Sequence, residues 1–163
     1  YRLFGAQLDP LSASLMVRGM KTYFVRYRAQ SAATLEIARF LEQHPGCTKV
    51  RYPGLESSPK HALARQQMRD FGTVICFDLK AGFEGGRRFA ETLQLFARTP
   101  SFGSTESLVM PPQMMQPKDF SPEQLIAADI GAGTVRLSIG LENVEDLKAD
   151  LAHALEAAAG GGA

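Results

Sequence analysis

Hydrophobic and polar residues alternate most regularly over residues 134–142, and this stretch predicts a β-strand with one buried face. The apolar side carries Val135, Leu137 and Ile139, and the polar side carries Thr134, Arg136 and Ser138. Because a strand is rigid, we expect Arg136 to project from a fixed position on the polar face. A planar guanidinium held in this way suits bidentate binding of a carboxylate. A surface ion pair is the alternative that the strand alone leaves open.

Apolar residues that recur every three or four positions predict helices over much of the remaining chain. The predicted helices cover residues 10–28, 31–43, 59–68, 83–96, 121–128 and the stretch that begins after Asn143. Two further strands are predicted at residues 49–52 and 73–79, and we interpret Cys76 in the second as a small buried side chain. Helices that interleave with a few short strands predict an α/β domain, with one sheet and helices mainly on one side.

Residues 98–120 break every regular period, because they contain three prolines and a dense set of serines and threonines. This composition is typical of a surface loop that is tethered at both ends. It is equally typical of the lip of a pocket, since loops on rigid scaffolds often carry binding groups. The pattern leaves both interpretations open.

Composition narrows the class of protein. The chain has 163 residues, of which 45% are hydrophobic and 21% charged, so we expect one globular domain. A net charge of +1 argues against nucleic acid as the main partner, and we expect no membrane partner because no apolar run approaches the ~20 residues that span a bilayer. Two cysteines without metal-ligand spacing favour a reducing cytoplasm and no metal site. The chain begins at Tyr1 rather than Met, so we expect that a preceding segment is missing.

No catalytic set can be assembled from residue spacing alone. There is no Gly-rich phosphate loop after a strand, and no Ser-His-Asp or Cys-His arrangement is indicated. We interpret His44 as a capping or solvated residue at a helix end, His61 as exposed in a first helical turn, and His153 as solvated. We therefore predict no catalytic residue in this chain.

Several stretches, in order along nearly the whole chain, together resemble the Cys/Met-metabolism enzymes that use pyridoxal phosphate. This family includes cystathionine γ-synthases, cystathionine lyases and methionine γ-lyases. The matching stretches are residues 5–10, 17–22 (Val-Arg-Gly-Met-Lys-Thr), 50–55 (Val-Arg-Tyr-Pro-Gly-Leu), 61–72, 101–108 (Ser-Phe-Gly-Ser-Thr-Glu-Ser-Leu) and 134–147. Each stretch alone is a weak signal, and their common order and spacing make the resemblance specific.

The resemblance extends only to the C-terminal part of that family. It implies a small, mostly antiparallel sheet with helices on one face, as in fold-type I pyridoxal-phosphate enzymes. Residues 1–28 are then a long linking helix to a missing cofactor domain, and residues 29–163 are the domain that binds the substrate carboxylate. The family's Schiff-base lysine lies in a Ser-x-Thr-Lys motif that does not occur here, and Lys21 matches a non-catalytic run. We therefore expect the missing domain to bind the cofactor and this chain alone to be inactive.

By the same resemblance, Arg136 matches the arginine that binds the substrate α-carboxylate, and Ser101 matches a serine beside it. The sequence departs from the family around this site. Pro100 stands where enzymes that handle cystathionine commonly carry Glu, and Phe102 stands where they carry Leu or Trp. Residues 115–116 and 29–34 also differ from the usual family runs. The carboxylate clamp is retained, whereas an apolar Pro100 offers no charge to a distal ammonium group.

The resemblance therefore favours one part of a carbon–sulfur lyase or transferase of transsulfuration, acting on sulfur amino acids as a homotetramer or dimer in the cytoplasm. The alternative is a stand-alone amino-acid-binding or oligomerisation module of α/β fold without catalysis. Apolar residues on more than one side of the helix predicted at residues 10–28 also predict a hydrophobic surface that a missing domain would cover.

Overall fold

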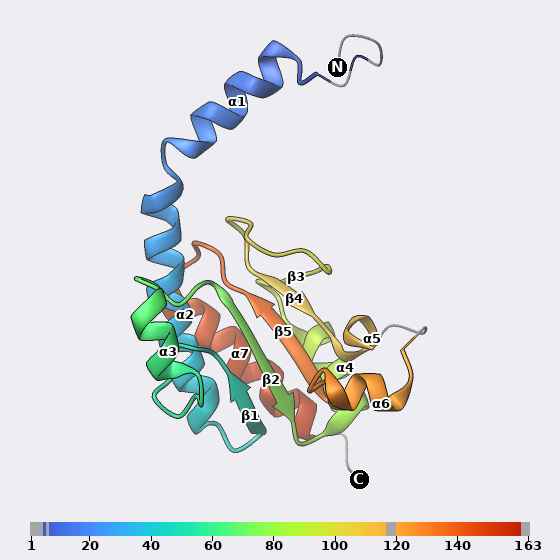
Figure 1. Ribbon diagram of the computed structural model, residues 1–163. Helices are drawn as coiled ribbons and strands as arrows, with labels where there is room; N and C mark the ends of the chain where they lie inside the picture. Colours follow the sequence, from blue (N-terminus) through green and yellow to red (C-terminus); the bar gives the residue numbers. More distant parts are fainter. Residues whose placement is uncertain (1–4, 6, 117–119, 161–163) are drawn as a thin grey trace.

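The computed structural model describes residues 5, 7–116 and 120–160, which form seven helices and five strands (Figure 1). The helices are α1 (Pro10–Met20), α2 (Tyr23–Gln43), α3 (His61–Gln67), α4 (Gly82–Thr92), α5 (Pro112–Met115), α6 (Pro122–Ala127) and α7 (Val144–Ala159). The strands are β1 (Cys47–Arg51), β2 (Val74–Leu79), β3 (Ala97–Arg98), β4 (Leu108–Met110) and β5 (Thr134–Ser138). None of these helices is long and apolar enough to cross a membrane.

The five strands form one sheet in the order β1-β2-β5-β4-β3. Three of the four neighbouring pairs are antiparallel, and only β3 and β4 run parallel. This arrangement confirms the mostly antiparallel sheet that the resemblance implies. The strand β5 lies at the centre, and the backbone of residues 136–138 is paired with β2 on one side and with β4 on the other.

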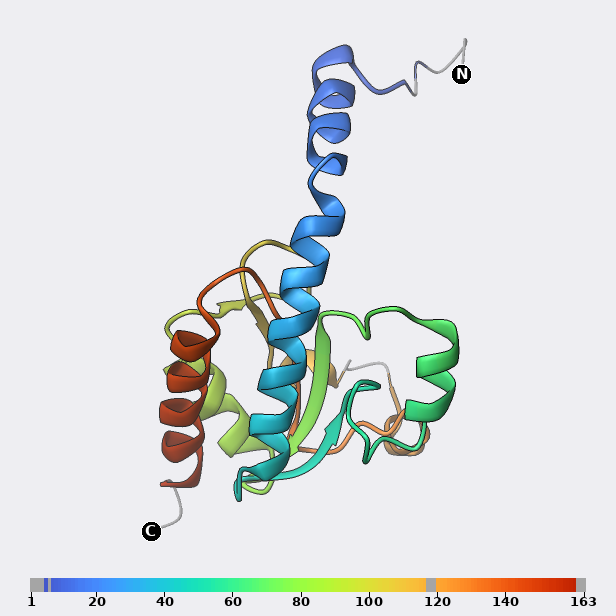
Figure 2. The same cartoon turned by 90° about the vertical axis from the view of Figure 1, so that its left-hand side faces the viewer.

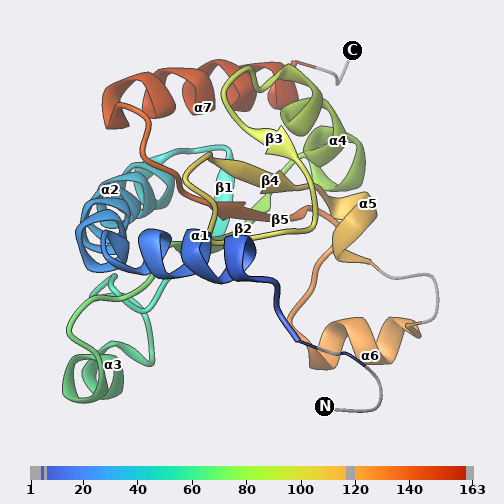
Figure 3. The same ribbon diagram turned by 90° about the horizontal axis from the view of Figure 1, so that it is seen from above.

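Three helices cover one face of the sheet, as predicted. Helices α2, α4 and α7 lie together on this face, whereas α3 and α6 lie elsewhere around the sheet (Figures 2 and 3). The apolar side of β5 is fully buried against these helices, and the Phe77 ring on β2 meets the Phe89 ring on α4 edge-on at 5.7 Å. Removal of this contiguous apolar surface from water contributes most of the free energy that holds the helices against the sheet.

The helix predicted over residues 10–28 is broken, which corrects that prediction. It ends at Met20, and α2 begins at Tyr23 and continues through the expected boundary to Gln43. In an unbroken helix the Gly19 carbonyl would accept the amide of Tyr23. Here that carbonyl accepts from the Thr22 amide at 3.4 Å and from the Arg26 guanidinium at 3.1 Å, and Arg26 also contacts the Thr22 hydroxyl, so a tighter turn and a side chain replace the helical bond. The assignment of residues 1–28 as an interdomain link stays a prediction.

The first helix projects away from the rest of the domain (Figures 1 and 2). No residue of α1 is buried, although the helix is rich in large apolar side chains. The exposed apolar residues of this segment, which we call the α1–α2 apolar surface, are Leu8, Leu11, Leu15, Met16, Val17, Met20, Tyr23, Phe24 and Val25. Their exposure agrees with the hydrophobic surface predicted from the sequence.

Residues 98–116 contain more regular structure than predicted. Strand β4 and the short helix α5 lie within this stretch, and β3 ends at Arg98.

The predicted helix over residues 83–96 ends at Thr92, yet Leu93 and Phe96 still reach the core. Cys76 is partly exposed rather than buried, because β2 buries only alternate residues. The predicted irregular stretch also includes residues 117–119, which lie outside the described residues.

Candidate functional site

Arg136 lies on the central strand with its side chain beneath residues 99–107, which we call the capping loop. Its Nη2 donates to the carbonyl oxygens of Pro100 at 2.7 Å and Ser101 at 3.0 Å. The ring of Phe102 lies with its centroid 5.6 Å from the guanidinium carbon, within range of a cation–π contact. The structure thus brings the two predicted site residues, Arg136 and Ser101, into direct contact.

The guanidinium of Arg136 keeps part of its donor capacity. It carries five N–H groups, and both recorded hydrogen bonds come from Nη2. Within residues 5, 7–116 and 120–160, Nε and Nη1 have no hydrogen-bond partner, and the side chain is partly exposed. Their N–H groups remain for an anionic oxygen, but Nε and Nη1 do not share an edge of the guanidinium. Binding of both oxygens of one carboxylate therefore requires Nη2 to exchange one of its carbonyl partners.

The capping loop is fixed to β5 and its continuation by polar contacts along its length. The Gly103 amide donates to the Ser138 hydroxyl at 3.0 Å, and the Leu141 amide donates to the Thr105 carbonyl at 2.8 Å. Gly103 has a φ of +78°, a conformation that glycine adopts without steric cost. The predicted polar face of the strand is therefore largely occupied, since Thr134 and Ser138 are each only 1% exposed.

A carboxylate closes the far end of the loop. The side chain of Glu142 accepts from the Ser107 amide at 2.7 Å and from the Ser107 hydroxyl at 2.8 Å. The same hydroxyl accepts from the Gly140 amide at 2.9 Å, and Ser107 is fully buried. A Cβ at Gly140 would lie 2.5 Å from the Thr105 carbonyl oxygen, so this close approach requires glycine. The two stretches with the strongest family resemblance, residues 101–108 and 134–147, thus meet in space.

A network of ion pairs lies on the same sheet face beside β5. Arg51 binds the carboxylate of Asp78 with both terminal nitrogens, at 3.1 and 2.6 Å, and binds Asp129 through Nε at 2.7 Å. Lys49 also pairs with Asp129 at 2.7 Å. The hydrogen bonds from Arg51 and Lys49 hold the pKa of Asp129 well below its usual range. Unlike Arg136, Arg51 is therefore already neutralised by carboxylates.

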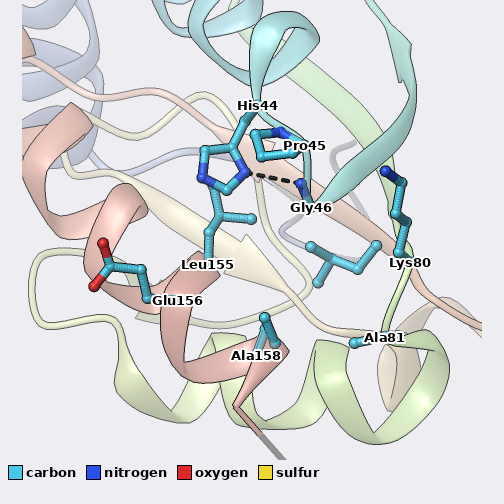
Figure 4. Close-up of a pocket in the computed structure, with 10 residues that line it drawn as sticks. His44, Pro45, Gly46, Lys80, Ala81, Leu155, Glu156 and Ala158 are labelled. Atoms are coloured by element: carbon cyan, nitrogen blue, oxygen red, sulfur yellow. Dashed lines mark hydrogen bonds between the residues drawn. The ribbon is translucent and has the colours of Figure 1, made fainter.

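A separate hollow of about 570 Å³ lies at the opposite end of the sheet from the capping loop, beside the end of α7 (Figures 1 and 4). It is lined by His44, Pro45, Gly46, Leu79, Lys80, Ala81, Leu155, Glu156, Ala158 and Ala159. His44 is the C-cap residue of α2 and is partly exposed, which agrees with its prediction as a capping or solvated residue, and the Gly46 amide donates to its Nδ1 at 3.1 Å. His61 is half-buried, which corrects its predicted exposure, because its Nδ1 lies 2.9 Å from the Pro53 carbonyl and its ring lies near Phe71.

The described lysines do not fit the role of a Schiff-base lysine. Lys21, Lys49, Lys60 and Lys80 are exposed, and Lys148 is paired with Glu145 at 2.6 Å. A lysine that forms a Schiff base has to be deprotonated, which burial or a neighbouring cation favours. We assign no cofactor contact to this chain. In the described residues there is also no group of three or more His, Cys, Asp or Glu side chains that could hold a metal.

Two residues that hold the capping loop were missed by the analysis of the sequence. Ser138 was placed on the polar face without a partner, and Gln30 was included only among the departures from the family. Gln30 is 6% exposed, and its side-chain amide donates to the carbonyls of Ser104 and Ile139, each at 2.8 Å. The sequence did contain one signal for Gln30: it is a polar residue at a position that the helical period places on the buried face.

Comparison with known proteins identifies the family. Residues 1–156 match the family described as Cys/Met metabolism PLP-dependent enzymes. The chain is 44% identical over 152 residues to L-methionine gamma-lyase of Fusobacterium nucleatum subsp. polymorphum. That match covers 93% of this chain and 38% of the relative, so the chain spans less than half of that protein.

Solved structures agree with this result. A Campylobacter jejuni protein assigned as an O-acetylhomoserine (thiol)-lyase, with pyridoxyl-lysine monophosphate, superposes with a TM-score of 0.87 at 36% identity over 95% of this chain and 37% of that one. Cystathionine gamma synthase of Xanthomonas oryzae pv. oryzae, in complex with cystathionine, superposes with a TM-score of 0.84 at 37% identity over 92% of this chain and 39% of that one. The chain therefore belongs to the Cys/Met metabolism family of pyridoxal-phosphate-dependent enzymes.

Proposed function

We propose that this chain is the C-terminal domain of a pyridoxal-phosphate-dependent carbon–sulfur lyase or transferase of transsulfuration, and that Arg136 and Ser101 hold the α-carboxylate of a sulfur amino acid. The observation that carries this proposal is the position of Arg136. Its guanidinium lies on the central strand under the capping loop, and two of its nitrogens, Nε and Nη1, have no partner in the described part of the chain. Carboxylate binding by a guanidinium is charge-assisted and directional.

Arg136 would orient the substrate as well as attract it. When bound, the cofactor supplies an electron sink for charge that develops at the substrate Cα. The residues of this chain would fix the carboxylate on that same carbon, and this fixes the direction of the remaining Cα bonds. A lysine at this position would supply charge without the planar pair of donors. The Ser101 carbonyl already engages Arg136, which leaves its hydroxyl as the group that would reach the substrate.

The surroundings of Arg136 favour a substrate whose distal group is uncharged. Pro100 and Phe102 flank the guanidinium, and Phe102 is 67% exposed at the open side of the site. Neither side chain carries a charge that could form an ion pair with a distal ammonium. The uncharged thioether of methionine suits this environment, and the name of the Fusobacterium nucleatum relative, L-methionine gamma-lyase, refers to that amino acid.

We further propose that catalysis requires a preceding domain that contains the cofactor-linking lysine, and that residues 1–28 join the two. The chain alone would then be inactive. The α1–α2 apolar surface would pack against that domain. The full-length protein would act in the cytoplasm as a homodimer or homotetramer.

The decisive experiment changes Arg136 to Lys and to Ala in the full-length protein. A charge-assisted hydrogen bond contributes about 1.5–3 kcal/mol, so kcat/KM for the amino-acid substrate should fall roughly 10- to 100-fold. Decarboxylated analogues should be bound equally well by the variants and the parent, because they lack the group that Arg136 holds. Ser101→Ala should cost about fivefold, as a neutral hydrogen bond contributes about 1 kcal/mol. Arg87→Lys, on the exposed face of α4, is the matched control.

An unchanged kcat/KM in both Arg136 variants would refute the proposal. It would show that Arg136 serves only to anchor the carbonyls of Pro100 and Ser101. Because R136K retains charge while R136A removes it, a loss confined to R136A would assign the effect to charge rather than to the planar donor pair.

A further inference from the structure

We infer that Gln30 is a positioning residue that sets the geometry of the proposed carboxylate site, although it lies on a different element and touches neither Arg136 nor Ser101. This inference rests on the proposed function and adds to it a residue that holds the site in place. It concerns the relation between the capping loop and β5, which together carry the two proposed carboxylate ligands.

The side-chain amide of Gln30 links three elements. It extends from α2, and its two N–H groups donate to the Ser104 carbonyl on the capping loop and to the Ile139 carbonyl after β5, each at 2.8 Å. Both partners are carbonyl oxygens, so the nitrogen rather than the oxygen of the amide must face them. With 6% exposure, the amide makes these bonds away from competing water.

The two acceptors lie at the same distance along the sequence from the two site residues. Ser104 follows Ser101 by three positions, and Ile139 follows Arg136 by three positions. One amide group thus fixes the separation between the segment that bears Ser101 and the segment that bears Arg136. The contacts of Arg136 itself lie nearer the start of the loop, so Gln30 restrains its second half.

Loss of this amide should loosen the loop locally. Without it, the Ser104 carbonyl has no partner in the described residues, while the Gly103 and Leu141 amides keep their bonds to Ser138 and Thr105. The hydrogen bonds of those two amides should then break and re-form more often. The carbonyls of Pro100 and Ser101, which orient the Arg136 guanidinium, should also become less fixed. We expect the affinity for the substrate carboxylate to fall while the fold is maintained.

The test replaces Gln30 with Leu and with Glu in the full-length protein. Leucine keeps the volume and removes both donors. Thr34→Val is the matched control, because Thr34 is a buried polar residue on the same helix whose hydroxyl bonds only to the Gln30 carbonyl of that helix. The first readout is hydrogen exchange at the Gly103 and Leu141 amides, compared with amides in α7. The second is the affinity for an amino-acid substrate compared with its decarboxylated analogue.

We expect Q30L to speed exchange at Gly103 and Leu141 about tenfold without changing α7, and to weaken carboxylate binding about tenfold. KM should rise more than kcat falls, and T34V should change neither readout. Q30E should behave like Q30L at about pH 8 and should recover part of the affinity, relative to the parent, at about pH 5, because only the protonated carboxyl can donate.

Unchanged exchange in Q30L, or exchange that rises equally in α7, would overturn the inference, since the role would then be absent or merely structural. A loosened loop with unchanged carboxylate affinity would overturn it too, provided that R136A lowers that affinity. If both R136K and R136A leave carboxylate affinity unchanged, the proposed function fails. The hydrogen-exchange result then decides alone whether Gln30 holds the loop.

Discussion

Replacement of Glu142 with Ala should destabilise the domain strongly, because within the described part of the chain only the carboxylate of Glu142 accepts a hydrogen bond from the Ser107 amide. Ser107 is fully buried, and both its amide and its hydroxyl donate to Glu142, at 2.7 and 2.8 Å. Alanine would remove both acceptors at once and would leave a buried N–H without a partner. The hydroxyl could still accept from the Gly140 amide.

The expected magnitude follows from these contacts. Hydrogen bonds to a charged group contribute about 1.5–3 kcal/mol, and an unsatisfied buried donor costs about 1–3 kcal/mol. The two figures describe the same site and are not added, so we expect E142A to lower the free energy of unfolding by about 1.5–3 kcal/mol. Glu142→Gln keeps one oxygen for the Ser107 amide and should cost about 1 kcal/mol, because its amide can donate to the Ser107 hydroxyl.

Urea unfolding of the 163-residue chain, followed by circular dichroism, measures these differences. The matched control is Glu106→Ala, because Glu106 lies next to Ser107 on the same loop and is exposed. Surface substitutions of this kind usually change stability by less than about 0.5 kcal/mol. If E142A and E106A had the same unfolding midpoint, the reasoning that the Glu142 carboxylate closes the capping loop would be wrong.

Three further predictions concern other parts of the chain. Burial raises the pKa of the Cys47 thiol to about 12 and that of the Tyr52 hydroxyl to about 12, so the folded chain keeps protons that the unfolded chain releases. Stability should therefore fall as the pH rises from about 9 to about 12, less steeply in C47A, and equal pH slopes would contradict this. The α1–α2 apolar surface should cause self-association that Phe24→Ser and Val25→Ser reduce; a clean monomer by sedimentation at high concentration would argue against it. Mixed with pyridoxal phosphate, the chain should not show the absorption band of a lysine-bound cofactor, and a stable band abolished by a single Lys substitution would disprove this.

Sequence periodicity predicted the helices and strands in which one spacing of apolar residues repeats over many positions. The strand at residues 134–138 and the helix after Asn143 were predicted because each repeats one spacing over several residues. Strand β4 was missed, since three residues cannot display a period and its pairing with β5 depends on distant sequence. The break at residues 21–22 was missed because the apolar period continues through it, and the hydrogen bonds of Thr22 and Arg26 to the Gly19 carbonyl leave no mark on that period.

The candidate site was predicted only as far as the resemblance reached. The pairing of Arg136 with Ser101 came from matched motifs, and the structure places the two in contact. Gln30 could not be inferred in the same way, because its acceptors are backbone carbonyls. A backbone carbonyl is present at every residue, so the sequence contains no signal for its partner.

The sheet ends at strands that resist further pairing, and this determines how the isolated chain should associate. The outer strand β1 carries the charged, exposed Lys49 and has an irregular register between Cys47 and Lys49, while the opposite outer strand β3 is only two residues long. Lysines, bulges and shortness are the features that prevent strand addition at a sheet edge. Association of this chain should therefore proceed through helical surfaces and give reversible, soluble oligomers rather than fibrils. Solutions of the isolated chain should accordingly not enhance thioflavin fluorescence.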